Sequence, residues 1–165
     1  MRPVLSVEGV RFERGSRLIL NGIDWRVSTG EHWVILGPNG CGKTSLINLL
    51  TGYDMATAGA IRVGRAQFGA ADWREVRKRI GLVASTLTYY LEPGEPVIDA
   101  VISGRKAEIN RIGRRSAKLV KEARALLKRF GCGHLAGSRW GVLSQGERQK
   151  VLICRALMAK FQVLI

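Results

Sequence analysis

Residues 37–45 of the chain, GPNGCGKTS, have the composition and spacing of a loop that binds phosphate. They match the pattern G-x-x-x-x-G-K-[ST], in which glycines let successive backbone N–H groups point into one concavity. Lys43 would place its charge on the outer phosphates of a nucleotide, and the Thr44 hydroxyl would bind Mg²⁺. The pattern therefore predicts a nucleoside triphosphate site formed by the whole loop: Gly37, Pro38, Asn39, Gly40, Cys41, Gly42, Lys43, Thr44 and Ser45.

A second short segment, LSQGE at residues 143–147, has the pattern of a helix start. Ser144 and Glu147 are spaced as in a capping box, which by itself explains their presence. Gly146, however, is a poor residue for the first turn of a helix. A helix N-terminus with a hydroxyl and a glycine that permits close approach is also a place where an anion binds. On the residues alone, both interpretations stay open.

The elements that would position these segments follow from the patterning of the chain. Period-two alternation and short apolar runs predict strands, and helical spacing of apolar residues predicts helices. The predicted strands cover residues 4–12, 17–28 with a turn at Asn21–Gly22, 31–37, 59–64, 79–85 and 161–165, and the predicted helices cover residues 43–52, 111–131 and 144–160. Strands that alternate with helices indicate an α/β layered domain, with a mostly helical insert near residues 95–145.

The composition is that of a globular protein with a strongly basic second half. The net charge is +14, and residues 61–165 hold 21 of the 27 Lys and Arg. This charge indicates either solvated helix faces or a surface for nucleic acid or anionic membrane. No stretch approaches the roughly 20 apolar residues of a membrane span, and the first residues lack a secretory signal pattern. Three cysteines without metal-ligand spacing predict reduced thiols in a cytosolic protein.

With both motifs in place, the chain resembles the ATP-binding cassette (ABC) family over essentially all 165 residues. Residues 37–45 are similar to the family's Walker A loop. The segment 143–147 is similar to its LSGGQ signature, with Leu143, Ser144 and Gly146 in place, Gln145 for the first Gly and Glu147 for the final Gln. The resemblance implies a P-loop NTPase core in one domain, residues 1–165, with an N-terminal antiparallel β region and a helical subdomain near 95–145 that carries the signature.

The resemblance also implies partners and cofactors. In that family two cassettes face each other, as a homodimer or a paired cassette, and ATP with Mg²⁺ lies between the Walker A loop of one and the signature of the other. The expected role is to hydrolyse ATP and energise a membrane transporter with separate transmembrane subunits, at the cytoplasmic face of the membrane. The alternatives are a soluble, non-transport ABC ATPase that acts on nucleic acid or the ribosome, which the basic half would support, and a regulatory protein that binds ATP without hydrolysing it.

The sequence departs from the family pattern at three places. Arg14 stands where the family usually has an aromatic residue that stacks on adenine, with Phe12 two residues earlier, and Ser85 stands where the family has the Q-loop glutamine. A planar guanidinium stacks on rings, so Arg14 remains a candidate for the base. The third departure is that no Walker B Asp, catalytic Glu or switch His follows the signature helix. We therefore expect no catalytic residue in this chain, a Walker B strand at its end packed beside residues 32–36, and no hydrolysis by the chain itself.

Overall fold

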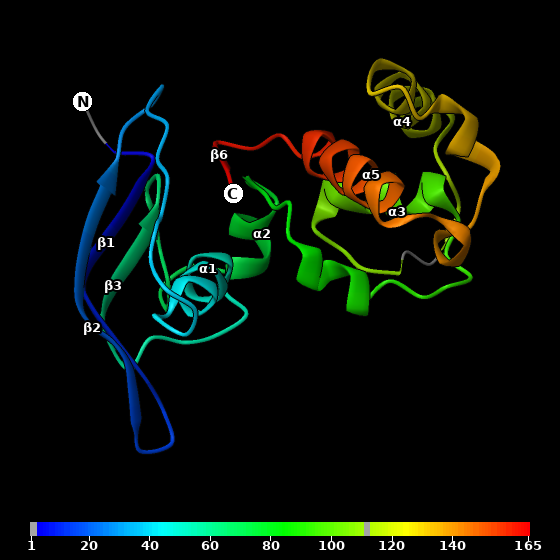
Figure 1. Cartoon of the computed structure of the whole chain (residues 1–165). Coiled ribbons are helices and arrows are strands. Elements are labelled where there is room, and N and C mark those ends of the chain that lie inside the picture. The colour runs from blue at the N-terminus through cyan, green and yellow to red at the C-terminus, as the bar shows by residue number, and fades with distance from the viewer. Residues whose placement is uncertain (1–2, 111–112) are drawn as a thin grey trace. The chain divides into compact units, whose positions relative to one another are not determined.

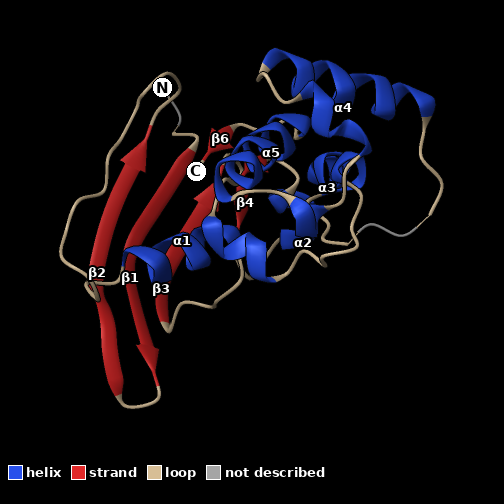
Figure 2. Cartoon of the chain, turned by 45° about the vertical axis from the view of Figure 1, so that its right-hand side comes forward, coloured by secondary structure: helices blue, strands red, loops and turns tan. Residues whose placement is uncertain are grey.

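The computed structural model describes residues 3–110 and 113–165, which form two compact units. The first unit ends at Val76 and the second begins at Arg77. Figure 1 follows the chain through both units, and Figure 2 distinguishes helices from strands by colour. The mixture of an antiparallel sheet with helices confirms the predicted α/β class.

The first unit is built on a four-stranded antiparallel sheet with the order β2-β1-β3-β4. The strands are β1 (Leu5–Arg14), β2 (Arg17–Val27), β3 (Ala58–Val63) and β4 (Ala66–Gln67). Burial alternates in the second half of β1 and at the end of β3, as in a half-buried strand, whereas Leu5, Ser6 and Val7 at the start of β1 are all buried. The apolar side chains that form this core include Leu5, Val7, Val10, Phe12, Ile61 and Val63.

The turn between the first two strands is not where Asn21–Gly22 predicts it. Arg14 pairs with Arg17, so the two-residue hairpin loop lies at residues 15–16. Asn21 and Gly22 lie inside β2, where the register changes between the pairs Phe12–Leu20 and Val10–Ile23. One extra residue on β2 makes a β-bulge, and Gly22 supplies its positive φ of 62°. Asn21–Gly22 therefore marks a β-bulge and not the predicted turn.

The strand predicted at residues 31–37 is not formed. Its apolar side chains are exposed instead, with 57% of Trp33, 79% of Val34 and 86% of Leu36 accessible. A run that is apolar on both faces forms a strand where neighbouring strands and covering layers bury it, and the described sheet of the first unit runs from β2 to β4 without it. Trp33 is held locally, by an edge-to-face contact with Trp25 and an indole N–H bond to the Glu31 carboxylate.

Helix α1 (Lys43–Thr51) agrees with the prediction at both ends. It begins at Lys43, within the last residues of the phosphate loop, and it ends at Gly52, whose φ of 71° lies in the left-handed region. A Cβ at Gly52 would lie 2.0 Å from Cδ1 of Trp73, so close packing also requires glycine there. Trp73 begins the short helix α2 (Trp73–Arg77).

The second unit is mainly helical. Its helices are α3 (Val97–Ser103), α4 (Ala117–Arg129) and α5 (Gln145–Met158), with 3₁₀ turns η1 (Ser85–Tyr89), η2 (Gly104–Lys106), η3 (Gly133–Gly137) and η4 (Trp140–Val142) between them. Helix α4 begins six residues later than predicted, and residues 111–112 of that prediction lie outside the described part. Helices α3 and α5 approach closely, since a Cβ at Gly104 would lie 1.9 Å from the Arg155 carbonyl oxygen.

The end of the chain forms a short strand, as predicted. Strand β6 (Val163–Leu164) pairs in parallel with β5 (Ile80–Gly81), within the second unit. The Ile165 N–H donates to the Gly81 carbonyl at 2.8 Å, and the Val83 N–H donates to the Ile165 carbonyl at 2.7 Å. Residues 32–36, beside which this strand is predicted to pack, belong to the first unit and form no strand there. Among the described helices, none combines the length and apolar character needed to cross a bilayer.

Candidate nucleotide-binding site

The phosphate loop connects residues 31–36 to helix α1 and packs against strand β2. Gly40 and Gly42 have φ values of 82° and 98°, which turn the chain tightly enough to bring it into α1. A Cβ at Gly42 would lie 2.7 Å from Cδ2 of Leu20, so no larger residue fits against the strand. The first intrahelical bond of α1 is from Leu46 N–H to the Gly42 carbonyl. The first N–H groups of a helix have no acceptor within the helix, so those at the start of α1 are available to an anion.

The Lys43 ammonium lies across the loop. Its Nζ donates to the carbonyl oxygens of Gly37 at 2.7 Å and Pro38 at 2.8 Å. The Sγ of Cys41 lies 3.7 Å from the same nitrogen. These contacts hold a positive charge at the centre of the loop, where it can pair with phosphate oxygens.

A cavity of about 420 Å³ opens over the loop. This volume is in the range of sites for small organic ligands. One wall is the loop and the start of α1, and the other is the β1–β2 hairpin. The lining residues are Arg14, Arg17, Leu18, Ile19, Asn39, Gly40, Gly42, Lys43, Thr44 and Ser45. The loop and Arg14, which the sequence proposed separately, therefore meet in one cavity.

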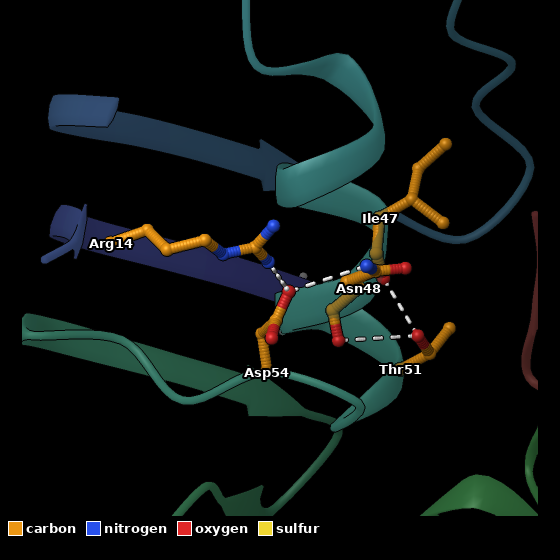
Figure 3. Close-up of polar contacts among 5 residues, drawn as sticks. All are labelled: Arg14, Ile47, Asn48, Thr51 and Asp54. Atoms are coloured by element: carbon orange, nitrogen blue, oxygen red, sulfur yellow. Dashed lines mark hydrogen bonds and ion pairs between the residues drawn. The ribbon is translucent and has the colours of Figure 1, made fainter. Parts of the chain in front are cut away.

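Arg14 is held in place by α1 and the loop that follows it (Figure 3). Its Nη2 lies 3.0 Å from Oδ2 of Asp54, and the same oxygen accepts from Nδ2 of Asn48 at 3.2 Å. The guanidinium carbon also lies 5.7 Å from the centre of the Phe12 ring. Phe12 itself is buried among the core residues and does not line the cavity. Its ring contacts the Arg14 guanidinium on the side of the core. Of the two candidates for stacking on adenine, only Arg14 therefore reaches the cavity.

Sequence reasoning missed the residues that complete this site. Asp54 lies 40 residues from Arg14, and Arg17, Leu18 and Ile19 carry no motif. Thr51 strengthens the end of α1 by donating its hydroxyl to the Ile47 carbonyl at 2.7 Å (Figure 3). No spacing rule connects these positions, because the hairpin and α1 come together only in the folded unit.

The signature segment starts helix α5 in the second unit, with both bonds of the predicted capping box. The Glu147 N–H donates to Ser144 Oγ at 3.4 Å, and the Ser144 N–H donates to Glu147 Oε2 at 2.8 Å. The Ser144 hydroxyl also donates to that carboxylate at 2.7 Å. These hydrogen bonds, with a smaller contribution from His134, lower the pKa of Glu147. A Cβ at Gly146 would meet nothing within 4 Å, so this helix end is open to an approaching group.

Ser85, at the Q-loop position, begins η1 and is exposed. Its carbonyl accepts from the Thr88 hydroxyl, so the residue caps a turn of the second unit. Exposed Tyr89 and Tyr90 follow it, with 87% and 61% of their surfaces accessible. The described residues contain no group of three or more His, Cys, Asp or Glu that could hold a metal ion.

Fold and loop together define a P-loop nucleotide-binding domain, and comparisons with known proteins agree. The family profile described as "ABC transporter" matches residues 20–165. The chain is 37% identical over 163 residues to the uncharacterized ABC transporter ATP-binding protein YlmA of Bacillus subtilis, covering 98% of the chain and 62% of the relative. It is 32% identical to the phosphonates import ATP-binding protein PhnC of Thiobacillus denitrificans, covering 98% and 63%. The chain belongs to the ABC transporter family.

Solved structures show the same fold. An ATP-binding cassette of an ABC transporter in its ADP conformation superposes with a TM-score of 0.79 at 24% identity, covering 99% of this chain and 68% of that one. A putative metal-chelate type ABC transporter in an inward-facing conformation gives a TM-score of 0.76 at 28% identity, covering 99% and 59%. The chain spans about 62% of the length of the first curated relatives it matches.

Proposed function

We propose that the chain is the nucleotide-binding part of an ABC transporter ATP-binding protein and that it binds ATP with Mg²⁺ at residues 37–45. The observation that carries this proposal is the position of Lys43, whose ammonium is held at the loop carbonyls beside the open start of α1. A polyphosphate there would receive backbone N–H groups, one positive charge and the helix dipole together. Thr44 would supply the protein's ligand to Mg²⁺.

Arg14 is the residue proposed to face the adenine ring. It lines the same cavity as the phosphate loop, and Asp54 holds its guanidinium in one orientation. A planar guanidinium stacks on an aromatic ring, and part of its charge is already balanced by Asp54. Leu18 and Ile19 add apolar surface on the hairpin side of the cavity.

Binding without hydrolysis is proposed for residues 1–165 alone. No carboxylate is among the described residues that line the nucleotide cavity. Attack on the γ-phosphate needs a group that orients water and accepts its proton. The relatives are longer than this chain. In a protein of their length, residues outside 1–165 would supply that group, and the protein would hydrolyse ATP.

The remaining partners follow the family arrangement. Leu143, Ser144, Gln145, Gly146 and Glu147 would face the nucleotide held by a second cassette, and the open position of Gly146 supports this. Separate transmembrane subunits, at the cytoplasmic face of a membrane, would contact the exposed Tyr89 and Tyr90. Tyrosines of this kind supply large contact areas with a polar end at protein interfaces. Ser85, just before them, would couple that contact to the nucleotide. Residues near 95–145 would act as the helical subdomain within one cassette domain, 1–165.

The experiment is a pair of measurements on the purified chain: ATP affinity by calorimetry with Mg²⁺, and phosphate release. We expect saturable binding, with Lys43→Ala losing at least about 2 kcal/mol of binding free energy, because a charge-assisted contact to phosphate is removed. Lys118→Ala, which removes the same charge from exposed α4, should bind as the parent does. Equal binding by the parent and Lys43→Ala would contradict the site, and turnover that Lys43→Ala abolishes would contradict binding without hydrolysis.

Nucleic-acid binding is the second candidate, and one observation favours it. Helix α4 exposes a row of cationic side chains: Lys118, Lys121, Arg124, Lys128 and Arg129. A surface of this kind binds phosphate backbones with an affinity that falls steeply with salt. Salt-dependent binding of single-stranded RNA, weakened when Lys121 and Lys128 are both replaced by alanine, would favour this function over transport. Co-purification with an integral membrane protein, lost in a Tyr89→Ala/Tyr90→Ala variant, would favour transport.

A further inference from the structure

A second cavity, of about 290 Å³, lies within the second unit and shares no residue with the nucleotide cavity. It is formed where the start of α3, the side of α4 and the segment after η3 meet. Three arginines line it: Arg115, Arg124 and Arg139. The volume is at the lower end of the range for small-molecule sites. We call it the arginine cavity.

Two of the three guanidinium groups are already oriented. Arg115 donates from Nε and Nη2 to the Asp99 carboxylate, at 2.9 and 2.7 Å. Arg139 donates from Nη1 to the Gly94 carbonyl at 2.7 Å. Each guanidinium has five N–H donors, so both groups keep donors beyond these bonds. Because their orientations are set before any ligand arrives, little side-chain freedom is lost on binding.

The third group, Arg124, is exposed on α4, and no hydrogen bond or ion pair ties it to another described residue. No carboxylate is among the described lining residues. Asp99 and Glu95 lie near Arg115 and balance part of the charge. Three positive groups at the cavity against these two carboxylates leave it with a net attraction for anions.

The rest of the wall is apolar. Ile98 is 3% exposed, and Val120 and Ala136 are half-buried beside it. An inorganic anion would leave this surface in contact with water. A ligand that carries an apolar part next to its charged group would cover it.

We propose that the arginine cavity binds a small organic oxyanion, a phosphate monoester or a carboxylate with an apolar body. The oxyanion lies among Arg115, Arg124 and Arg139, and the apolar body lies on Ile98, Val120 and Ala136. The proposal is independent of nucleotide binding, because the two cavities have no residue in common. It gives this chain a second ligand site, distinct from the phosphate loop.

The test is a titration of the full chain carrying Lys43→Ala, so that the phosphate loop does not compete for the probe. Phenyl phosphate, benzoate and inorganic phosphate are added at constant ionic strength, and amide signals are followed by two-dimensional NMR. We expect saturable shifts at Val120, Gly137 and Ser138 with phenyl phosphate or benzoate, and the tighter of the two identifies the oxyanion. Inorganic phosphate should bind at least about fivefold more weakly, because it leaves the apolar wall uncovered.

Arg124→Ala is the decisive variant, because Arg124 is exposed and makes no contact on which folding depends. We expect it to weaken the tighter probe roughly tenfold, as the loss of a charge-assisted bond does. The matched control is Lys121→Ala, which removes the same charge from the same helix outside the cavity, and it should change the affinity less than about twofold. Equal effects of the two variants, no saturable shift, or equal affinity for inorganic phosphate and phenyl phosphate would each overturn the proposal.

Discussion

Replacing Asp54 by asparagine tests how Arg14 is held beside the nucleotide cavity. The substitution keeps the size of the side chain but removes the charge that pairs with Arg14 at 3.0 Å. The Arg14 side chain is 64% exposed and that of Asp54 is 24% exposed, so solvent screens the pair. For such a pair the expected loss of folding stability is about 0.2–1 kcal/mol.

The effect on nucleotide binding should be larger than the effect on folding. Without Asp54 the guanidinium is free to rotate, and ordering it on the base costs about 0.5–1.5 kcal/mol. ATP should therefore bind about two- to tenfold more weakly to Asp54→Asn. Calorimetry measures the affinity, and urea unfolding of the same samples measures the stability.

The matched control is Glu8→Gln in the same unit. Glu8 is a partly exposed carboxylate that pairs with Arg62 at 2.6 Å and with Arg26 at 3.9 Å, and none of the three lines the cavity. This variant should lose a similar amount of stability and keep the ATP affinity of the parent. If Asp54→Asn loses stability but binds ATP as the parent does, then Arg14 does not face the base and the reasoning fails.

Three further predictions concern single residues. Cys41 is exposed in the phosphate loop, whereas Cys132 and Cys154 are buried. Maleimide should therefore label Cys41 alone in the folded chain, and Mg-ATP should slow that labelling. A labelling rate that Mg-ATP does not change would refute the site. Gly52→Ala should lower the free energy of unfolding in urea by about 2 kcal/mol or more, because its φ is positive and the new Cβ would clash with Trp73. The control is Gly30→Ala, which has a φ of 84° but open space around it and should lower the free energy of unfolding clearly less. The pKa of Glu147 is lowered, so the stability that its carboxylate contributes is present above the ordinary pKa of 4.5 and is lost as the pH falls through the lowered value. In a plot of stability against pH, Glu147→Gln should therefore reduce the loss of stability at acid pH, and an unchanged loss would contradict the capping role.

The parts that sequence predicted well depend on neighbours along the chain. The phosphate loop, the end of α1 at Gly52 and the capping box at the start of α5 each involve residues within a few positions of one another. Backbone conformation and local hydrogen bonds decide such features, and glycine spacing or an S-x-x-E pattern reports them directly.

The parts that sequence mispredicted depend on distant partners. Residues 31–37 have the composition of a buried strand, but a strand needs another strand to bond to, and composition does not say whether one is there. Gly22 carries the same signal for a bulge as for a turn, and only the register between β1 and β2 distinguishes the two. Both β5 and β6 lie within segments predicted as strands, but the sequence did not predict that these two strands pair with each other.

The amino-acid sequence by itself predicted a glycine-rich loop of the G-x-x-x-x-G-K-[ST] pattern, a capping box at the start of a helix and membership of the ABC family. Tertiary structure alone decided what lies beside the loop. It brought Arg14 to Asp54, 40 residues away, and formed a cavity with Arg17, Leu18 and Ile19. It also gathered Arg115, Arg124 and Arg139 around a second cavity. The physical reason is that a loop needs only local backbone geometry, whereas a cavity exists only once separate elements have packed together.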